Sequence, residues 1–226
     1  MYLACFILAT NLAAPGANLQ AAEKSADQQR PRSGFIPDYS LLQKIEGVRD
    51  AQVYRYRRPD AVRSQYHSAL IDPVVLHQVK PEGSLTADVL AQTRAALDQH
   101  IRAAVVSRGL NIVDKPGTGV IQISVALSGA EIETEGFKPR NLLPVSAVMK
   151  VASRAAGVDA KKPVFLVESK LVDSFSGNLV GAGMITLTGE SFRKESGTAE
   201  AFMSLSRKVV ETALQLANDP NPPKSD

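Results

Sequence analysis

The stretch GVIQISVALSGAEIE, residues 119–133, constrains the fold more than any other part of the sequence. Apolar side chains alternate with polar ones along it, and this period of two is typical of a strand with one buried face. The apolar set is Ile121, Ile123, Val125 and Leu127. Segments 85–108 and 198–217 have apolar residues at helical spacing, and such helices would pack on a sheet of this kind.

The remaining patterns extend the sheet. Further strands are expected at 51–57, at 68–76, at 110–114 and on both sides of a Ser-Gly-Asn turn at 176–178. A third helical pattern spans 145–157, and the order along the chain is β-β-α-β-β-α-β-β-α. A long helix between two strands favours a crossover connection. We therefore predict an α+β fold with a mixed, largely antiparallel sheet, about three helices packed on it and one βαβ crossover.

The N-terminus indicates export. Residues 1–22 contain no charged side chain, and the apolar run from Leu3 to Ala14 has the length of a signal-peptide core. This run is too short to span a bilayer. We expect cleavage near Ala21 or Ala22 and a mature protein in the periplasm or cell envelope. No Lys or Arg precedes the run, so a basic stretch upstream of the given start is an alternative, and a buried N-terminal helix is another.

The single cysteine, Cys5, leaves a second route to the envelope open. The tripeptide Leu3-Ala4-Cys5 resembles the end of a lipobox, but the apolar region lies after the cysteine instead of before it. An outer-membrane lipoprotein is therefore the alternative localisation. Once residues 1–22 are removed, the chain has no cysteine for a disulfide, a thiolate nucleophile or a metal site.

Composition predicts one domain. Polar residues 23–32 are interpreted as a flexible tether, residues 33–217 as a single α+β domain, and residues 218–226 as a disordered tail. With 44% hydrophobic residues in 226, the chain can form a core of its own. Its net charge of +3 is too small to favour nucleic acid as a partner, and no recognition motif supports one.

The decapeptide SGFIPDYSLL, residues 33–42, follows the tether and is unexpectedly apolar. Burial of several such side chains would offset the entropy lost on ordering the segment. We interpret it as a structural clasp where the tether meets the domain. Its residues are Phe35, Ile36, Pro37, Asp38, Tyr39, Leu41 and Leu42. A recognition peptide for an envelope partner is the alternative.

The expected strand AQVYRYR, residues 51–57, alternates tyrosine with arginine, so the two residue types would project from opposite faces. The arginines could meet phosphate groups of lipids or could guard an exposed sheet edge. Candidate binding residues in and after this strand are Arg55, Arg57, Arg58, Arg63, Tyr54 and Tyr56.

No motif pairs a nucleophile with a base. His67, Ser68 and Asp72 have the residue types of a catalytic triad, but neighbours on one strand project to different faces. We expect no catalytic residue, no metal site and no cofactor. An enzyme would have to rest on carboxylates, and the candidates are Asp38, Asp72 and Asp173.

Five motifs, taken in order, resemble a known bacterial family. They are SGFIPDYSLL, VYRYRRPDA, LIDPV after Tyr66, NLLPVSAV and DSFSGNLVGA. The sequence is similar in these motifs to domain-of-unknown-function family 3313, regarded as envelope lipoproteins, from residue 33 to about residue 190. The resemblance implies a location and no activity, and the complete lipobox usual in such proteins is absent from this sequence.

The sequence thus predicts an exported cell-envelope protein that acts as a non-enzymatic binding or assembly module. Its partner would be an envelope protein, a lipid or a glycan, and peripheral membrane association is compatible with this role. The alternative is a small carboxylate-dependent hydrolase or carbohydrate-active enzyme of the envelope.

Overall fold

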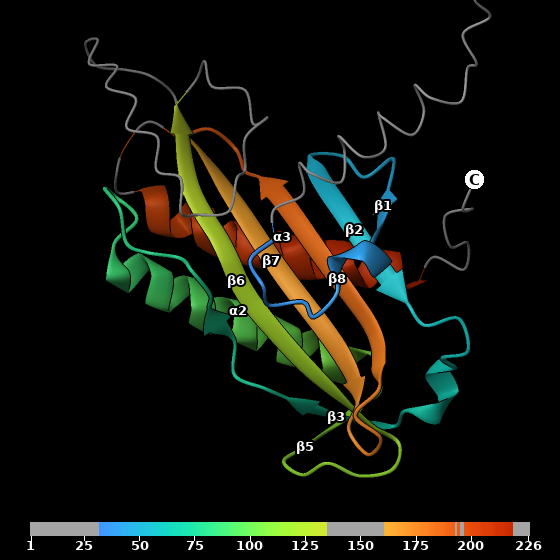
Figure 1. Cartoon of the computed structure of the whole chain (residues 1–226). Helices are drawn as coiled ribbons and strands as arrows, with labels where there is room; N and C mark the ends of the chain where they lie inside the picture. The colour runs from blue at the N-terminus through green and yellow to red at the C-terminus, as the bar shows by residue number, and fades with distance from the viewer. Residues whose placement is uncertain (1–31, 135–160, 193, 195–196, 219–226) are drawn as a thin grey trace, which may run out of the picture.

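The computed structural model describes residues 32–134, 161–192, 194 and 197–218. In these residues, one eight-stranded sheet is covered on one face by two long helices, and the N-terminal segment crosses the other face (Figure 1). The strands are β1 (Gln43–Ile45), β2 (Ala51–Arg57), β3 (Ser68–Ile71), β4 (Val75–Leu76), β5 (Asn111–Val113), β6 (Val120–Thr134), β7 (Lys161–Asp173) and β8 (Leu179–Thr188). The helices are α2 (Ala87–Ser107) and α3 (Thr198–Asn218), with short 3₁₀ turns η1 (Tyr39–Leu41) and η2 (Arg63–Gln65).

The sheet is mixed, as predicted. Its order is β1-β2-β8-β7-β6-β3-β5, with β4 paired to β6. The pairs from β1 to β6 are antiparallel, whereas β3 is parallel to both of its neighbours. Because α2 connects β3 to the adjacent parallel strand β5, the expected βαβ crossover is present.

Three expectations need correction. Two α-helices occur in the described residues, whereas about three helices were predicted. The helical pattern at 145–157 lies outside the described residues. The expected strand at 68–76 is divided into β3 and β4 around Pro73, which has no N–H to donate to a neighbouring strand. Helix α3 includes Asn218, which was assigned to the tail.

Helix α2 begins at an N-cap, where the Thr86 hydroxyl accepts a hydrogen bond of 3.2 Å from the Val89 amide. Its apolar stripe is buried against the sheet and against α3. The buried stripe comprises Leu90, Leu97, Ile101 and Val105. None of the helices in the described residues is long and apolar enough to cross a bilayer.

The sheet has an apolar cluster on each face. The larger one lies under the helices and includes Phe165 and Phe202, whose ring centroids are 6.1 Å apart. The smaller one lies under the N-terminal segment and contains Leu166 and Met184 from the sheet. Neighbouring residues of the central strands β7 and β8 therefore serve opposite faces.

Candidate functional site

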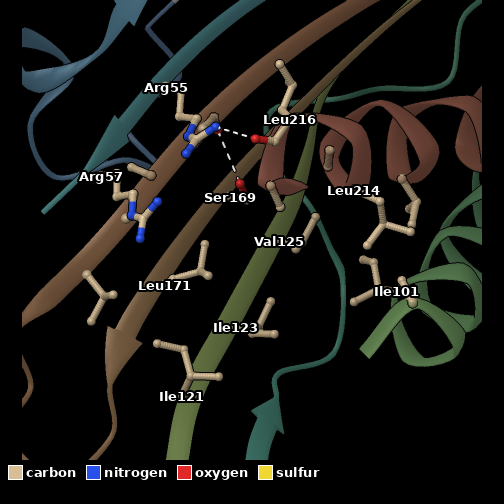
Figure 2. A pocket seen from close by; sticks show the side chains of 18 of the residues that line it. Arg55, Arg57, Ile101, Ile121, Ile123, Val125, Ser169, Leu171, Leu214 and Leu216 are labelled. Carbon is tan, nitrogen blue, oxygen red and sulfur yellow. Dashed lines mark hydrogen bonds between the residues drawn. The ribbon is translucent and has the colours of Figure 1, made fainter. Parts of the chain in front are cut away.

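A cavity of about 420 Å³ lies between the sheet and the C-terminal halves of the two helices (Figure 2). Its walls are mainly aliphatic side chains from the sheet and from both helices. Among these are Ile121, Ile123, Val125, Leu171, Ile101 and Leu214, all labelled in Figure 2. Such a volume and such a lining are typical of a small-molecule pocket.

Two glycines of β8 help to form this hollow. Gly181 is paired with Arg57 on one side and with Leu171 on the other, and Gly183 is paired with Arg55 and Ser169. Paired residues of antiparallel strands share a face, and a strand glycine has no side chain to fill the space there. At Gly183 the Ser169 side chain comes close to the strand, since a Cβ atom built there would lie 3.2 Å from the Ser169 hydroxyl oxygen.

Arginine supplies all the charged side chains of the cavity. Of the lining residues, the charged ones are Arg55, Arg57, Arg63 and Arg108. Within the part of the chain that the structure describes, no carboxylate lines the cavity. Arg57 and Arg63 are exposed to solvent and Arg108 is partly exposed, so this side forms the mouth. The cavity is apolar inside and positively charged at its mouth.

Arg55 connects the sheet to the C-terminal end of α3 through a hydrogen bond. Its Nη1 donates a hydrogen bond of 2.6 Å to the Leu216 carbonyl, in the last turn of α3 (Figure 2). The final carbonyl groups of a helix have no partners within the helix, and a cation beside them is favourable. Arg55 therefore has a structural reason to be here, independent of any ligand.

The arginines at the mouth have weaker or more exposed contacts. Arg57 Nη2 donates to the Ala61 carbonyl at 3.3 Å, and Arg63 Nη2 donates to the Arg108 carbonyl at 3.5 Å. Arg108 Nη1 donates to the Asn218 side chain. Burial lowers the pKa of the Arg108 guanidinium, and the positive charge of Arg63 lowers it further. Within the described residues, none of the salt bridges involves Arg57, Arg63 or Arg108.

Three of the four predicted arginines thus meet in one place, together with Arg108, which sequence reasoning missed. Arg58 does not line the cavity, and its Nε lies 2.9 Å from Asp60 Oδ1. Arg108 is the C-cap of α2 and could have been suspected, because basic residues are common at helix ends. Its proximity to Arg63 depends on the tertiary fold.

The idea that these arginines guard a sheet edge fits only part of β2. Strand β1 pairs with Val53, Tyr54 and Arg55, so that stretch of β2 is internal, and only Arg57 lies beyond the pairing with β1. The side chains of Tyr54 and Tyr56 pack on the smaller apolar cluster, away from the helices. The predicted division of arginines and tyrosines between the two faces of the strand is therefore present.

The predicted clasp segment, residues 33–42, lies on the same face as these tyrosines. Ile36, Tyr39 and Leu42 are buried against Leu166 and Met184. Of these, Tyr39 begins the 3₁₀ turn η1 and Leu42 follows it as the C-cap, whereas Ile36 precedes the turn. Pro37, Asp38 and Leu41 face solvent instead, and Phe35 is half-buried. Leu41 therefore does not contribute the buried surface that the apolar pattern predicts.

Under the clasp segment lies a fully buried carboxyl group, that of Glu168. Tyr39 donates a hydrogen bond of 2.5 Å to its Oε1, and the hydroxyl groups of Ser33 and Ser128 donate to its Oε2. Burial raises the pKa of Tyr39, and its hydrogen bond to Glu168 raises it further. Glu168 follows the apolar run Pro163–Val167 in β7. A charged residue at that place is the only feature of the sequence that could have indicated a buried carboxyl group.

The segment also contacts β7 and the region after β4. His77 Nε2 lies 3.0 Å from the Ser33 carbonyl, and Gln78 Nε2 donates to the same oxygen at 2.6 Å. The Phe35 ring centroid lies 5.8 Å from that of His77 and 4.8 Å from the Lys170 ammonium. These polar and aromatic contacts fix the segment at both sides of the buried carboxyl group.

The residues of a hypothetical triad form no relay. His67 Nδ1 lies 3.0 Å from the Ser68 hydroxyl. The Asp72 carboxylate instead accepts hydrogen bonds from Gln122 at 3.0 Å and from Ser124 at 2.6 Å. These bonds join the end of β3 to β6, and the Asp72 carboxylate thus bonds to β6 instead of orienting the His67 ring as a triad requires.

The other two candidate carboxylates cap turns. Asp38 accepts from the Ser40 amide and hydroxyl, which lower its pKa. Asp173 accepts from the Ser176 amide at 2.8 Å, and bonds to Ser176 lower the pKa of Asp173 as well. Neither lines the cavity. Among the described residues, no three His, Cys, Asp or Glu side chains gather as metal ligands would.

A comparison with known families identifies the chain. Residues 31–211 match the model of a family described as a protein of unknown function, DUF3313. The chain belongs to this family. The match begins just before the clasp segment and ends within α3, so it includes the whole segment and most of the cavity lining, whereas Ala213, Leu214, Leu216 and Ala217 lie beyond it. The membership expected from the motifs is confirmed.

No curated protein matches this DUF3313 chain. Solved structures with a similar arrangement include a PelC dodecamer from Paraburkholderia phytofirmans, at 16% identity and a TM-score of 0.38, covering 71% of this chain and 95% of that one. A DUF4136 protein from Bacteroides thetaiotaomicron has 11% identity and a TM-score of 0.40, covering 75% and 97%. A minor lipoprotein from Acinetobacter baumannii has 6% identity and a TM-score of 0.34, covering 67% and 95%. Similarities at this level carry no information on function or location.

Proposed function

We propose that this DUF3313 protein is an exported cell-envelope module that binds a small apolar molecule in the cavity and does not convert it chemically. The observation that carries the proposal is the aliphatic hollow of about 420 Å³ between the sheet and the helices. Its volume falls within the range of about 300–1,000 Å³ that is usual for ligand pockets. Of the three partner classes expected from the sequence, this lining favours a lipid over a glycan or a protein.

The polar side chains of the lining support binding rather than catalysis. Besides the arginines, they are the hydroxyl groups of Tyr66 and Ser169. A general base of the common kinds would be a histidine or a carboxylate. Neither type is found among the described lining residues. The hydrolase alternative therefore gains no support from this site.

The location in the proposal rests on residues 1–22, which lie outside the described residues. A protein exported to the envelope meets lipids and their breakdown products in its own compartment. An apolar cavity holds such a molecule away from water, because transfer of apolar surface out of water is favourable.

The proposal is tested with Nile red, an uncharged dye whose fluorescence rises in apolar surroundings. We expect the full chain to bind the dye in a saturable way. Ile123→Phe adds bulk to a side chain that points into the cavity and should weaken binding by about tenfold.

Ile112→Phe is the matched control, because Ile112 is 37% exposed on β5 and does not line the cavity. It should leave the affinity for Nile red unchanged. Equal affinities for both variants and the original chain, or a failure of the chain to bind the dye, would exclude the cavity as a ligand site.

A further inference from the structure

The mouth of the cavity carries an electrostatic signal that its apolar walls do not explain. Arg57, Arg63 and Arg108 come from three separate elements: β2, η2 and the end of α2. Like charges brought together in this way repel one another, and the lowered pKa of Arg108 reflects that proximity as well as burial. A bound anion would relieve the repulsion.

The capping of helix ends accounts for only part of this arrangement. The Arg55 bond of 2.6 Å to Leu216 is short and half-buried, as expected for a structural contact. Arg57 belongs to no helix end, and its contact with the Ala61 carbonyl is long at 3.3 Å. Arg63 reaches the Arg108 carbonyl only at the limit of a hydrogen bond, 3.5 Å. The guanidinium groups at the mouth therefore keep donors that a ligand can use.

Charge and shape together narrow the ligand class. An apolar chain fits the aliphatic interior formed by residues such as Ile123 and Leu171, and an anionic group fits the arginines at the opening. Guanidinium groups bind carboxylates and phosphates through paired, charge-assisted hydrogen bonds. We infer that the ligand is an anionic amphiphile, with one aliphatic chain inside the cavity and a carboxylate or phosphate group at Arg57, Arg63 and Arg108. This inference rests on the proposed function and specifies the ligand for the same cavity.

The experiment measures displacement of Nile red by a series of molecules that share one decyl chain. Undecanoate and decyl phosphate carry the two anionic groups, decanol is uncharged, and decyltrimethylammonium is cationic. We expect either anion to bind at least about tenfold more tightly than decanol, and the cation to bind most weakly. The tighter of the two anions assigns the headgroup as carboxylate or phosphate.

The variant Arg57→Gln/Arg63→Gln removes two exposed charges at the mouth and should cancel most of the preference for anions, with little change for decanol. Arg49→Gln/Arg94→Gln is the matched control, since it removes the same charge at exposed positions that do not line the cavity. It should keep the preference. Added salt should weaken binding of the anions and leave decanol unchanged, because exposed charges are screened.

The outcomes separate the two proposals. If all four decyl compounds displace Nile red equally, or if both double variants behave alike, the anion inference is wrong and the apolar cavity stands. If Nile red itself does not bind, the proposed function fails and the inference fails with it.

Discussion

At the scale of a single residue, the fully buried carboxyl group of Glu168 connects the sheet to the N-terminal segment. A carboxyl group without hydrogen-bond partners is costly to bury, and here Tyr39, Ser33 and Ser128 supply three donors. Two of these donors belong to the N-terminal segment and one to β6. The sheet and the segment therefore depend on each other, because the segment satisfies a group that the sheet buries.

Tyr39→Phe tests this dependence directly. Loss of the hydroxyl group leaves a buried acceptor without one of its donors, so we expect the free energy of unfolding to fall by about 1–3 kcal/mol. Urea denaturation at neutral pH measures the change. Tyr56→Phe is the control, since Tyr56 lies only at the margin of the same cluster, and its effect should stay within about 0.5 kcal/mol. Equal effects of the two variants would contradict a special role for the buried pair.

The same variant has a second signature at alkaline pH. The pKa of Tyr39 is raised in the folded protein by burial and by Glu168, so above pH about 10 the unfolded chain loses this proton first. The stabilisation is complete below that pH and declines as the pH rises towards the folded pKa. The stability deficit of Tyr39→Phe relative to the original chain should therefore be constant from about pH 8 to about pH 10 and shrink as the pH rises above about 10. A deficit that stays constant above about pH 10 would show that Tyr39 does not titrate in this way.

At the scale of an element, the clasp segment is short, yet its burial is highly selective. Leu41 and Leu42 are chemically identical neighbours, and their side chains are 38% and 2% exposed. Leu41 is the last residue of the turn η1, whereas Leu42 is its C-cap with an extended backbone, and this change of backbone at the end of the turn separates the two side chains. A docked structural clasp and a free recognition peptide predict different consequences for the two leucines.

Leu42→Ala should destabilise the protein by about 2–5 kcal/mol if the segment is a structural clasp, whereas Leu41→Ala should change stability by no more than about 0.5 kcal/mol. Thermal and urea unfolding of both variants measure the difference. Phe35, which is only half-buried, should fall between them. If Leu42→Ala leaves stability unchanged, the segment does not hold the domain together and the recognition-peptide hypothesis is favoured.

At the scale of the whole molecule, the sequence predicts the individual helices and strands better than it predicts which of them lie side by side in the fold. Helices α2 and α3, strand β2 and the β7–β8 hairpin follow from local periodicity and turn residues, and all are present. Local patterns carry no information on which strand lies beside β2. For that reason the edge-guard interpretation of its arginines fits only Arg57.

The cavity is also beyond the reach of local patterns. Gly181 and Gly183 are two positions of a strand that have no side chains. Only the register of β2 and β8 places these positions beside Arg55 and Arg57. Arg108 and Arg63 are 45 residues apart in the chain and meet through the packing of η2 against the end of α2. Sequence reasoning therefore finds three of the cavity's four arginines as a cluster in the chain, without the hollow that they surround.

Export is a property of the whole chain and is tested on the native protein. Mass spectrometry of the mature protein should find a start near Ala22 in a periplasmic or envelope fraction, as expected for a removed signal peptide. A lipid-modified Cys5 would instead support the lipoprotein alternative. A cytoplasmic protein that retains Met1 would contradict both.

The opposite faces of β8 have a consequence for how this chain can diverge. Gly181 and Gly183 lie on the cavity side, whereas Ala182 and Met184 pack under the N-terminal segment. Insertion of one residue within this strand would exchange the two sets and turn the thioether of Met184 into the hollow. The turn at 174–178 can absorb a change in length without this exchange. Lineages descended from a common ancestor should therefore accumulate insertions and deletions at that turn and exclude them from the strand.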